Sequence, residues 1–159
     1  MNRSFPPGRT QSAARGPLAG LKVVDLTHVM AGPTCTLMLA DMGADVIKIE
    51  KWPNGDDTRH SVPPKIGDEA ASFLMMNRNK RGIVLDLKSA GGKEILRRLI
   101  ASADVLVENF TPGAMDRLGF GYEALHADFP ALISIAPCPA SAAPDPTSIA
   151  AASIWSRRR

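Results

Sequence analysis

The stretch Leu21–Lys51 constrains the fold more than any other part of the sequence. It begins with an apolar run rich in β-branched residues, Leu21–Leu26, which is long enough for a buried strand. An Ala-Gly-Pro turn then leads into a helix predicted at Thr34–Met42, and a second strand is predicted at Ala44–Ile49. Strand, helix and strand within about thirty residues predict a βαβ unit. The parallel strands of such a unit need cover on both faces, and ligands usually lie beyond their carboxyl ends.

Strands and helices keep alternating beyond this unit. Further strands are predicted at Gly82–Leu87, Asp104–Phe110 and Leu132–Ile135. The predicted helices are Glu69–Asn77, a helix capped by Ser89 that runs to Ala101, Pro112–Leu118, and Tyr122–Phe129. A long polar loop, Trp52–Asp68, separates the βαβ unit from the rest, and long loops are often functional. The alternation predicts an α/β fold with a Rossmann-like, doubly wound and mostly parallel sheet.

The two ends of the chain differ in composition from this body. Residues 1–17 contain arginine, serine and proline but no acid, and residues 137–159 are mostly alanine, proline, serine and arginine. Both segments are expected to be disordered, the first as a leader and the second as a tail. Three arginines at each end account for more than the whole net charge of +3. The body between them therefore offers no basic patch for nucleic acid.

The absence of several common motifs excludes some classes of function. No G-x-G-x-x-G follows the first strand, and no P-loop or metal-binding pattern occurs, so neither a dinucleotide site nor a metal is expected. No apolar run reaches the roughly 18 residues of a membrane span. Two cysteines provide no disulfide framework, which favours a reducing cytoplasm. Cys35 is expected to be a small buried packing residue rather than a reactive thiol, and His28 an ordinary loop histidine.

Taken together, four segments resemble one known family. They are LAGLKVVDLTHVMAGPTCTLMLADMGADVIKIEK, GDDTRH, NRNKRGIVLDLKSAGGKEIL and ADVLVENFTPGAMDRLGFGYEAL. Their order and spacing resemble the N-terminal region of the family III CoA-transferases, over Leu18–Ala136. The resemblance implies that residues 18–136 are the N-terminal part of that family's large domain, so that the Rossmann-like sheet is incomplete in this chain. It also implies an interlocked homodimer for the full-length protein.

The resemblance implies a site for coenzyme A near the ends of the strands. Carried over by motif, the CoA-binding positions are Met30, Ala31, Lys51, Leu85, Asp86, Leu87, Lys88, Asn109, Phe110, Thr111 and Arg117. All but Arg117 lie at or just past the carboxyl ends of predicted strands, where an open α/β sheet binds its ligands. Lys51, Lys88 and Arg117 suit the phosphates of CoA. Lys51 replaces an arginine of some members, which weakens fork-like phosphate contacts.

The chemistry implied by the resemblance is transfer of CoA from an acyl-CoA to a carboxylic acid. In the family, an aspartate attacks the thioester to give a mixed anhydride and CoA thiolate, which is covalent catalysis. That aspartate belongs to a later motif, so no catalytic residue is assigned here and this chain alone is expected to be inactive. Asp25, Asp45 and Asp86 are interpreted as strand-end or cap residues.

The end of the resemblance at Ala136 suggests a shifted reading frame. Codons for Pro139–Thr147, read one register later, are compatible with Gly-Phe-Gly-Ser and then Thr-Gly-Pro-Tyr. The same shift makes Ala151–Ser156 compatible with Gly-Phe-Asp-Leu-Val. Members of the family continue with such a run, so we expect residues 137–159 to be a frameshifted tail. Stop codons in the shifted frame of the coding DNA would refute this hypothesis.

Two alternatives to the transferase stay open. The first is a fragment of an α-methylacyl-CoA racemase, which shares the fold but uses a Gly-His-Asp motif. The segments VENFTPG and NRNKRGI are nearer the transferase pattern, and the shifted codon across Ser153 cannot encode that histidine. The second alternative is a non-catalytic CoA-binding module, which would melt cooperatively and bind CoA without turnover.

Overall fold

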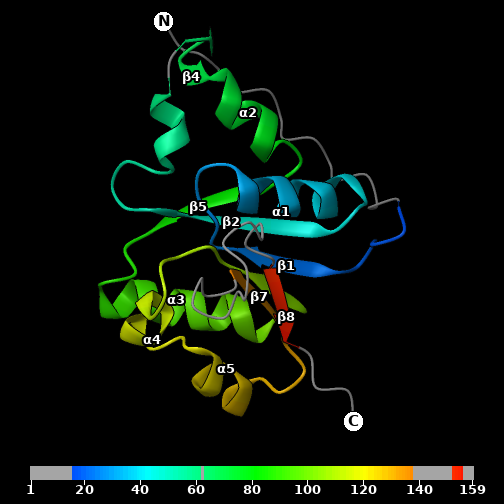
Figure 1. The fold of residues 1–159 in the computed structure, drawn as a ribbon, viewed down its shortest axis with the longest axis vertical. Coiled ribbons are helices and arrows are strands. Elements are labelled where there is room, and N and C mark those ends of the chain that lie inside the picture. The colour runs from blue at the N-terminus through cyan, green and yellow to red at the C-terminus, as the bar shows by residue number, and fades with distance from the viewer. Residues whose placement is uncertain (1–15, 62, 138–151, 156–159) are drawn as a thin grey trace, which may run out of the picture.

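A mostly parallel sheet forms the centre of the computed structural model, which describes residues 16–61, 63–137 and 152–155 (Figure 1). The strands of this sheet lie in the order β5-β2-β1-β6-β7-β8. Their bounds are β1 Lys22–Asp25, β2 Asp45–Lys51, β5 Arg81–Leu85, β6 Val105–Val107, β7 Ile133–Pro137 and β8 Ala152–Trp155. All pairs but β7 with β8 are parallel. The chain runs outward from β1 through β2 to β5 and then crosses back to β6 on the other side of β1. This reversal between β1 and β6 creates the switch point at which such sheets bind ligands.

Helices cover both faces of the sheet (Figure 1). Helix α1 (Ala31–Asp41) packs on one face, where Ala40 joins Val23, Val46 and Val105 in a small core. The other face carries a larger core, to which α3 contributes Leu96 and Ile100. The helices on that side are α3 Ala90–Ala101, α4 Ala114–Leu118 and α5 Tyr122–Asp128. The prediction of a doubly wound α/β fold is therefore confirmed.

The register of the sheet brings distant segments to one edge. Asp25 at the end of β1 pairs with Lys48 on β2 and with Val107 at the end of β6. The last pair between β2 and β5 joins Lys51 to Leu85. Since these strands are parallel, the loops that follow them emerge at the same edge of the sheet.

The predicted loop Trp52–Asp68 contains more structure than its polar sequence suggests. It holds a 3-10 helix, η1 (Asp57–His60), and the strand β3 (Lys65–Ile66), which pairs with β4 (Glu69–Ala70). The helix predicted from Glu69 starts later, as α2 (Ala71–Asn77), because Glu69 and Ala70 form this hairpin. Helix α1, in contrast, begins earlier than predicted, at Ala31 rather than Thr34, with Pro33 in its first turn.

The prediction for the tail is wrong at five residues, Pro137, which ends β7, and Ala152–Trp155. The sequence predicts no regular structure after Ala136, but Ala152–Trp155 forms β8 and pairs antiparallel with β7. Without β8, the backbone groups along that side of β7 would be left unpaired at an open sheet edge. The rest of the predicted tail, residues 138–151 and 156–159, and residues 1–15 of the predicted leader lie outside the described residues. In the part of the chain that is described, no helix is long and apolar enough to cross a membrane.

Candidate functional site

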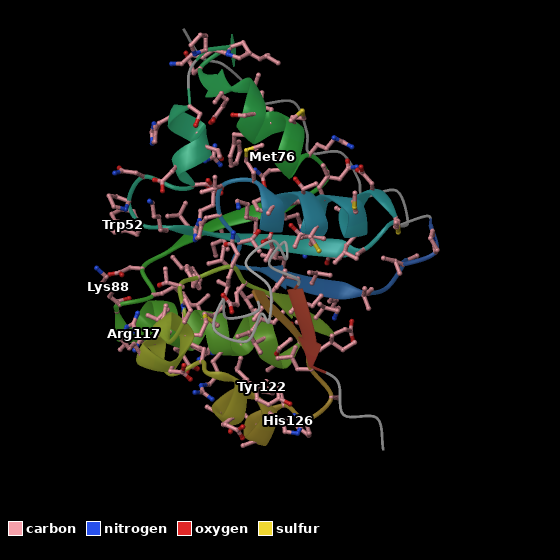
Figure 2. The ribbon with its side chains drawn as sticks, in the orientation of Figure 1. Trp52, Met76, Lys88, Arg117, Tyr122 and His126 are labelled. Carbon is pink, nitrogen blue, oxygen red and sulfur yellow. The ribbon has the colours of Figure 1, made fainter. Side chains whose placement is uncertain are left out.

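A cavity of about 720 Å³ lies at the carboxyl ends of β1, β2, β5 and β6. Its floor is apolar, with Leu26, Ile49 and Leu85 at the ends of three strands. The other lining residues are His28, Val29, Glu50, Lys51, Trp52, Asp57, Asp86, Leu87, Lys88, Asn109, Phe110, Thr111 and Leu118. Figure 2 shows Trp52, Lys88 and Arg117 along one side of the molecule. The cavity thus occupies the position that the topology favours for a ligand.

The loops after β1 and β6 are joined where the topology switches direction. The backbone N–H of His28 donates to Oδ1 of Asn109 (2.8 Å), and Nδ2 of Asn109 donates to the carbonyl oxygen of His28 (2.8 Å). The His28 ring lies 5.4 Å from the Phe110 ring. Asn109 therefore fixes the loops on either side of the switch point as one unit.

Helix α1 approaches the end of β1 very closely. A Cβ atom on Gly32 would lie 2.4 Å from the Cβ of Thr27, so a side chain at this position would force the helix away. The carboxylate of Asp25 accepts hydrogen bonds from the hydroxyls of Thr27 (2.5 Å) and Thr36 (2.6 Å). It also accepts from Nζ of Lys80 (3.1 Å). These contacts fix the segment that carries His28 and Val29 into the cavity.

A network of charged side chains, most of them buried, holds together the segments next to the cavity. It consists of Asp25, Lys48, Glu50, Asp56, Arg59 and Lys80. Lys48 is only 1% exposed, and its Nζ donates to the carbonyl oxygen of Thr27 (2.7 Å) and lies 2.9 Å from Oδ2 of Asp56. Oδ1 of Asp56 accepts from the backbone N–H (3.0 Å) and hydroxyl (2.8 Å) of Thr58. Lys48 therefore ties the end of β1 to the loop after β2.

The second half of this network holds the loop against the hairpin. Glu50 accepts two hydrogen bonds from Arg59, at 2.7 Å each, in a forked pair. Arg59 also donates to Glu69 on β4 (2.8 Å), and its guanidinium lies 3.7 Å from the centre of the Phe73 ring. Forked arginine–carboxylate pairs are geometrically specific, so this contact sets the position of η1.

The pKa values follow from these contacts. Burial alone would raise the pKa of Asp56, but hydrogen bonds from Lys48 and Thr58 and the charge of Lys48 outweigh it and lower the value to about 2. The pKa of Glu50 is also lowered: burial would raise it, but the hydrogen bonds from Arg59 outweigh burial. The pKa of His28 is lowered by burial and by the charge of Lys48, which outweigh the opposing charge of Asp56. His28 therefore presents a neutral ring to the cavity at pH 7.

The charges at the cavity rim are arranged differently. Nζ of Lys51 lies 2.5 Å from Oδ1 of Asp57, and these side chains are 49% and 69% exposed. Lys88 is exposed, and its backbone N–H donates to Oδ1 of Asp86 (2.9 Å), which shapes the turn after β5. These lysines are open to an incoming anion.

The structure brings most of the predicted CoA-binding residues into this one cavity. Those that line it are Lys51, Leu85, Asp86, Leu87, Lys88, Asn109, Phe110 and Thr111. Met30, Ala31 and Arg117 do not line it: Met30 precedes α1 with an exposed side chain, and Arg117 lies on α4 beside the lining residue Leu118.

Sequence reasoning missed several lining residues, chiefly His28, Val29, Trp52 and Asp57. His28 and Trp52 each follow a strand closely, so their position after parallel strands was a usable signal. The expectation for Cys35 was wrong, because this residue is exposed on α1. Its thiol pKa is raised by partial burial of the sulfur and by the charge of Asp25, which also argues against a reactive thiol. In the described residues, no three His, Cys, Asp or Glu side chains group as metal ligands would.

Known proteins resemble this chain in sequence. A family model described as CoA-transferase family III matches residues 18–137. The acetyl-CoA:oxalate CoA-transferase of Acetobacter aceti is 50% identical over 124 residues, which are 78% of this chain and 32% of that protein. The formyl-CoA:oxalate CoA-transferase of Escherichia coli O6:H1 is 52% identical over 117 residues, which are 74% of this chain and 28% of that protein.

The fold matches solved structures over the same part of the chain. A CAIB/BAIF family protein from Brucella suis superposes with a TM-score of 0.72 at 47% identity, over 76% of this chain and 33% of that one. The chain thus spans about a third of the length of the relatives it matches. With the match to the family model extending over most of its length, this chain belongs to CoA-transferase family III.

Proposed function

We propose that this chain supplies the CoA-binding part of an enzyme that moves CoA from an acyl-CoA thioester to a carboxylic acid. The observation that carries the proposal is the meeting of Lys51, Lys88 and Asn109 in one cavity, although they follow three different strands. Cations beside an apolar pocket at a topological switch point suit a ligand with phosphates at one end and an uncharged arm.

The residues have separate roles in this proposal. Lys51 and Lys88 bind phosphate groups, and Leu85, Leu87 and Phe110 contact the apolar surface of the ligand. The Asn109 side chain is already used in its hydrogen bonds to His28, so it acts by positioning the loops. Of the remaining proposed contacts, Asp86 and Thr111 line the cavity, whereas Met30, Ala31 and Arg117 do not.

The chemical step we propose follows the family resemblance. An aspartate oxygen attacks the thioester carbonyl, the C–S bond breaks and CoA leaves as its thiolate, so that the acyl group remains on the aspartate as a mixed anhydride. Asp25 is not a candidate for this nucleophile, because it is completely buried and accepts hydrogen bonds from Thr27 and Thr36. Asp45 is paired with Arg81 at the opposite edge of the sheet. The resemblance assigns the nucleophile to a later motif, outside the matched segments, and on that ground we propose that the 159-residue chain does not catalyse the transfer by itself.

The relatives suggest which substrates to test first. They are named for two different donors, acetyl-CoA and formyl-CoA, at nearly equal identity to this chain. The matched region therefore does not distinguish the donor. Both names contain oxalate, so oxalate is the first acceptor to test. We further propose a cytoplasmic protein whose full-length form is an interlocked homodimer, which sedimentation of the full-length protein tests.

The CoA site is tested by calorimetric titration of the 159-residue chain with CoA. Replacing both Lys51 and Lys88 with alanine is expected to raise the Kd for CoA by at least tenfold, because two phosphate partners are lost. Lys22→Ala is the matched control, since Lys22 is exposed at the amino end of β1, away from the cavity. Equal Kd values for the double variant and the control would contradict the proposal, as would a cooperatively melting chain that does not bind CoA.

The racemase and binding-module alternatives are separated by activity. With 2-methylacyl-CoA as substrate, exchange of the α-proton with deuterated water in the full-length protein would favour the racemase. CoA binding without either activity in the full-length protein would favour the module. Oxalate-dependent release of CoA from acetyl-CoA or formyl-CoA by the full-length protein is the result expected here.

A further inference from the structure

Trp52 has an unusual position for so large an apolar side chain. It is 66% exposed, whereas tryptophan is on average highly buried. It lines the cavity, and Figure 2 shows it on the same side of the molecule as Lys88. An exposed aromatic ring at the rim of a cavity has surface available for a ligand.

The backbone under this ring is fixed by the sheet. The N–H of Trp52 donates to the carbonyl oxygen of Leu85 (3.2 Å), which continues the pairing of β2 with β5 beyond the Lys51–Leu85 pair. Trp52 is thus attached to the sheet itself, and the network of Glu50 and Arg59 holds the loop that follows it. Contact with a ligand here costs little backbone ordering, because the backbone is already placed.

The charges beside Trp52 indicate which part of a ligand reaches it. Lys51 precedes it, and both Lys51 and Lys88 line the same cavity, so the ring shares this cavity with the cations assigned above to phosphates. In CoA the phosphates surround the adenosine, and the purine is the flat aromatic group of the molecule. Aromatic side chains bind such bases by stacking, which requires no particular hydrogen-bond pattern.

We propose that Trp52 is the stacking platform for the purine base of CoA and so sets the preference of this site for the complete nucleotide over its pantetheine arm. This proposal rests on the proposed function. It assigns a recognition role to a residue outside the positions transferred by resemblance. Lys51 and Lys88 then hold the phosphates while Trp52 covers one face of the base.

Binding of CoA, 3′,5′-ADP and 4′-phosphopantetheine to the 159-residue chain tests this proposal. Trp52→Ala is expected to raise the Kd for CoA and for 3′,5′-ADP about tenfold, the size typical of removing one base-stacking side chain, and to leave the Kd for 4′-phosphopantetheine unchanged. Trp52→Phe should recover most of the affinity. Ile66→Ala is the matched control, because Ile66 is 65% exposed on β3 and does not line the cavity.

Fluorescence gives a second readout in a chain that keeps Trp52. Trp155 is the other tryptophan, so Trp155→Phe leaves Trp52 as the single reporter. Addition of 3′,5′-ADP should quench its emission, and 4′-phosphopantetheine should not. The proposal is overturned if CoA binds without quenching, or if Trp52→Ala changes the Kd for CoA less than twofold. Both results leave the CoA site itself intact, whereas failure of the unmodified chain to bind CoA removes both proposals.

Discussion

The two groups of charges at the ends of β1 and β2 differ in how far their partners satisfy them. Lys48 and Asp56 are buried beneath the loop, where Lys48 also bonds the backbone of Thr27. Lys51 and Asp57, a few residues away, form an ion pair whose side chains are both exposed to solvent. The buried pair stabilises the fold, whereas the exposed Lys51 can exchange Asp57 for an anion of a ligand. Two lysines close together in sequence thus have different roles: the buried Lys48 stabilises the fold, and the exposed Lys51 is available to a ligand.

The largest expected effect comes from breaking the buried pair. Lys48→Met keeps much of the side-chain volume but leaves Asp56 without its cation, so we expect the free energy of unfolding to fall by about 3–5 kcal/mol. Lys51→Met is the matched variant, and loss of its exposed pair is expected to cost less than about 1 kcal/mol. Urea unfolding followed by circular dichroism measures both.

A double variant sharpens this comparison. Adding Asp56→Asn to Lys48→Met removes the stranded charge, so the two changes together should cost less than the sum of the single changes. Equal costs for Lys48→Met and Lys51→Met would show that the two lysines do not differ in the way described.

Acid should weaken the buried region next. The pKa of Asp56 is lowered from 3.8 to about 2, so its contribution to stability is fully present above pH 4 and is lost as the pH falls toward 2. A shift of this size corresponds to about 2 kcal/mol for this fully buried carboxyl. Glu50, whose pKa is also lowered, adds to the loss in the same direction. Urea unfolding at pH 7 and pH 2.5 measures the change.

The variant Asp56→Asn isolates this contribution. It lacks the titrating carboxyl, so its stability should fall less between pH 7 and pH 2.5 than that of the unmodified chain. If the two proteins lose the same stability over this range, Asp56 does not have the depressed pKa assigned to it.

The smallest effect is expected at the rim. Asp57→Asn releases Lys51 and removes a negative charge from the cavity mouth, so CoA should bind about two- to fivefold more tightly at low salt. The gain should shrink at high salt, because exposed charges are screened. Asp128→Asn is the control, since Asp128 is also exposed, at 48%, and is paired with Arg97, and neither residue lines the cavity. Weaker binding by Asp57→Asn would mean that Asp57 orders Lys51 for the ligand.

The sequence predicts the parallel strands well, because their β-branched apolar runs are a local signal. The burial of Lys48 and Glu50 has no such local signal, yet both are almost fully buried. Their burial depends on Asp56 and Arg59, which come from a loop whose composition resembles a solvated surface. Pairing between distant segments also decides the strand order and β8, which no local pattern encodes. The cavity was located by resemblance and by strand ends. Trp52 was missed although it directly follows β2, since its place after a strand does not show that its ring stays exposed.

Backbone amide NMR during a titration with CoA tests the central claim most directly. The account predicts chemical-shift changes that saturate together at Lys51–Trp52, Leu85–Lys88 and Asn109–Thr111, which meet at one edge of the sheet. Lys22, Asp45 and Ser102, which line a small cavity at the opposite edge, should not shift. Changes confined to that opposite edge, or none at all, would contradict the account.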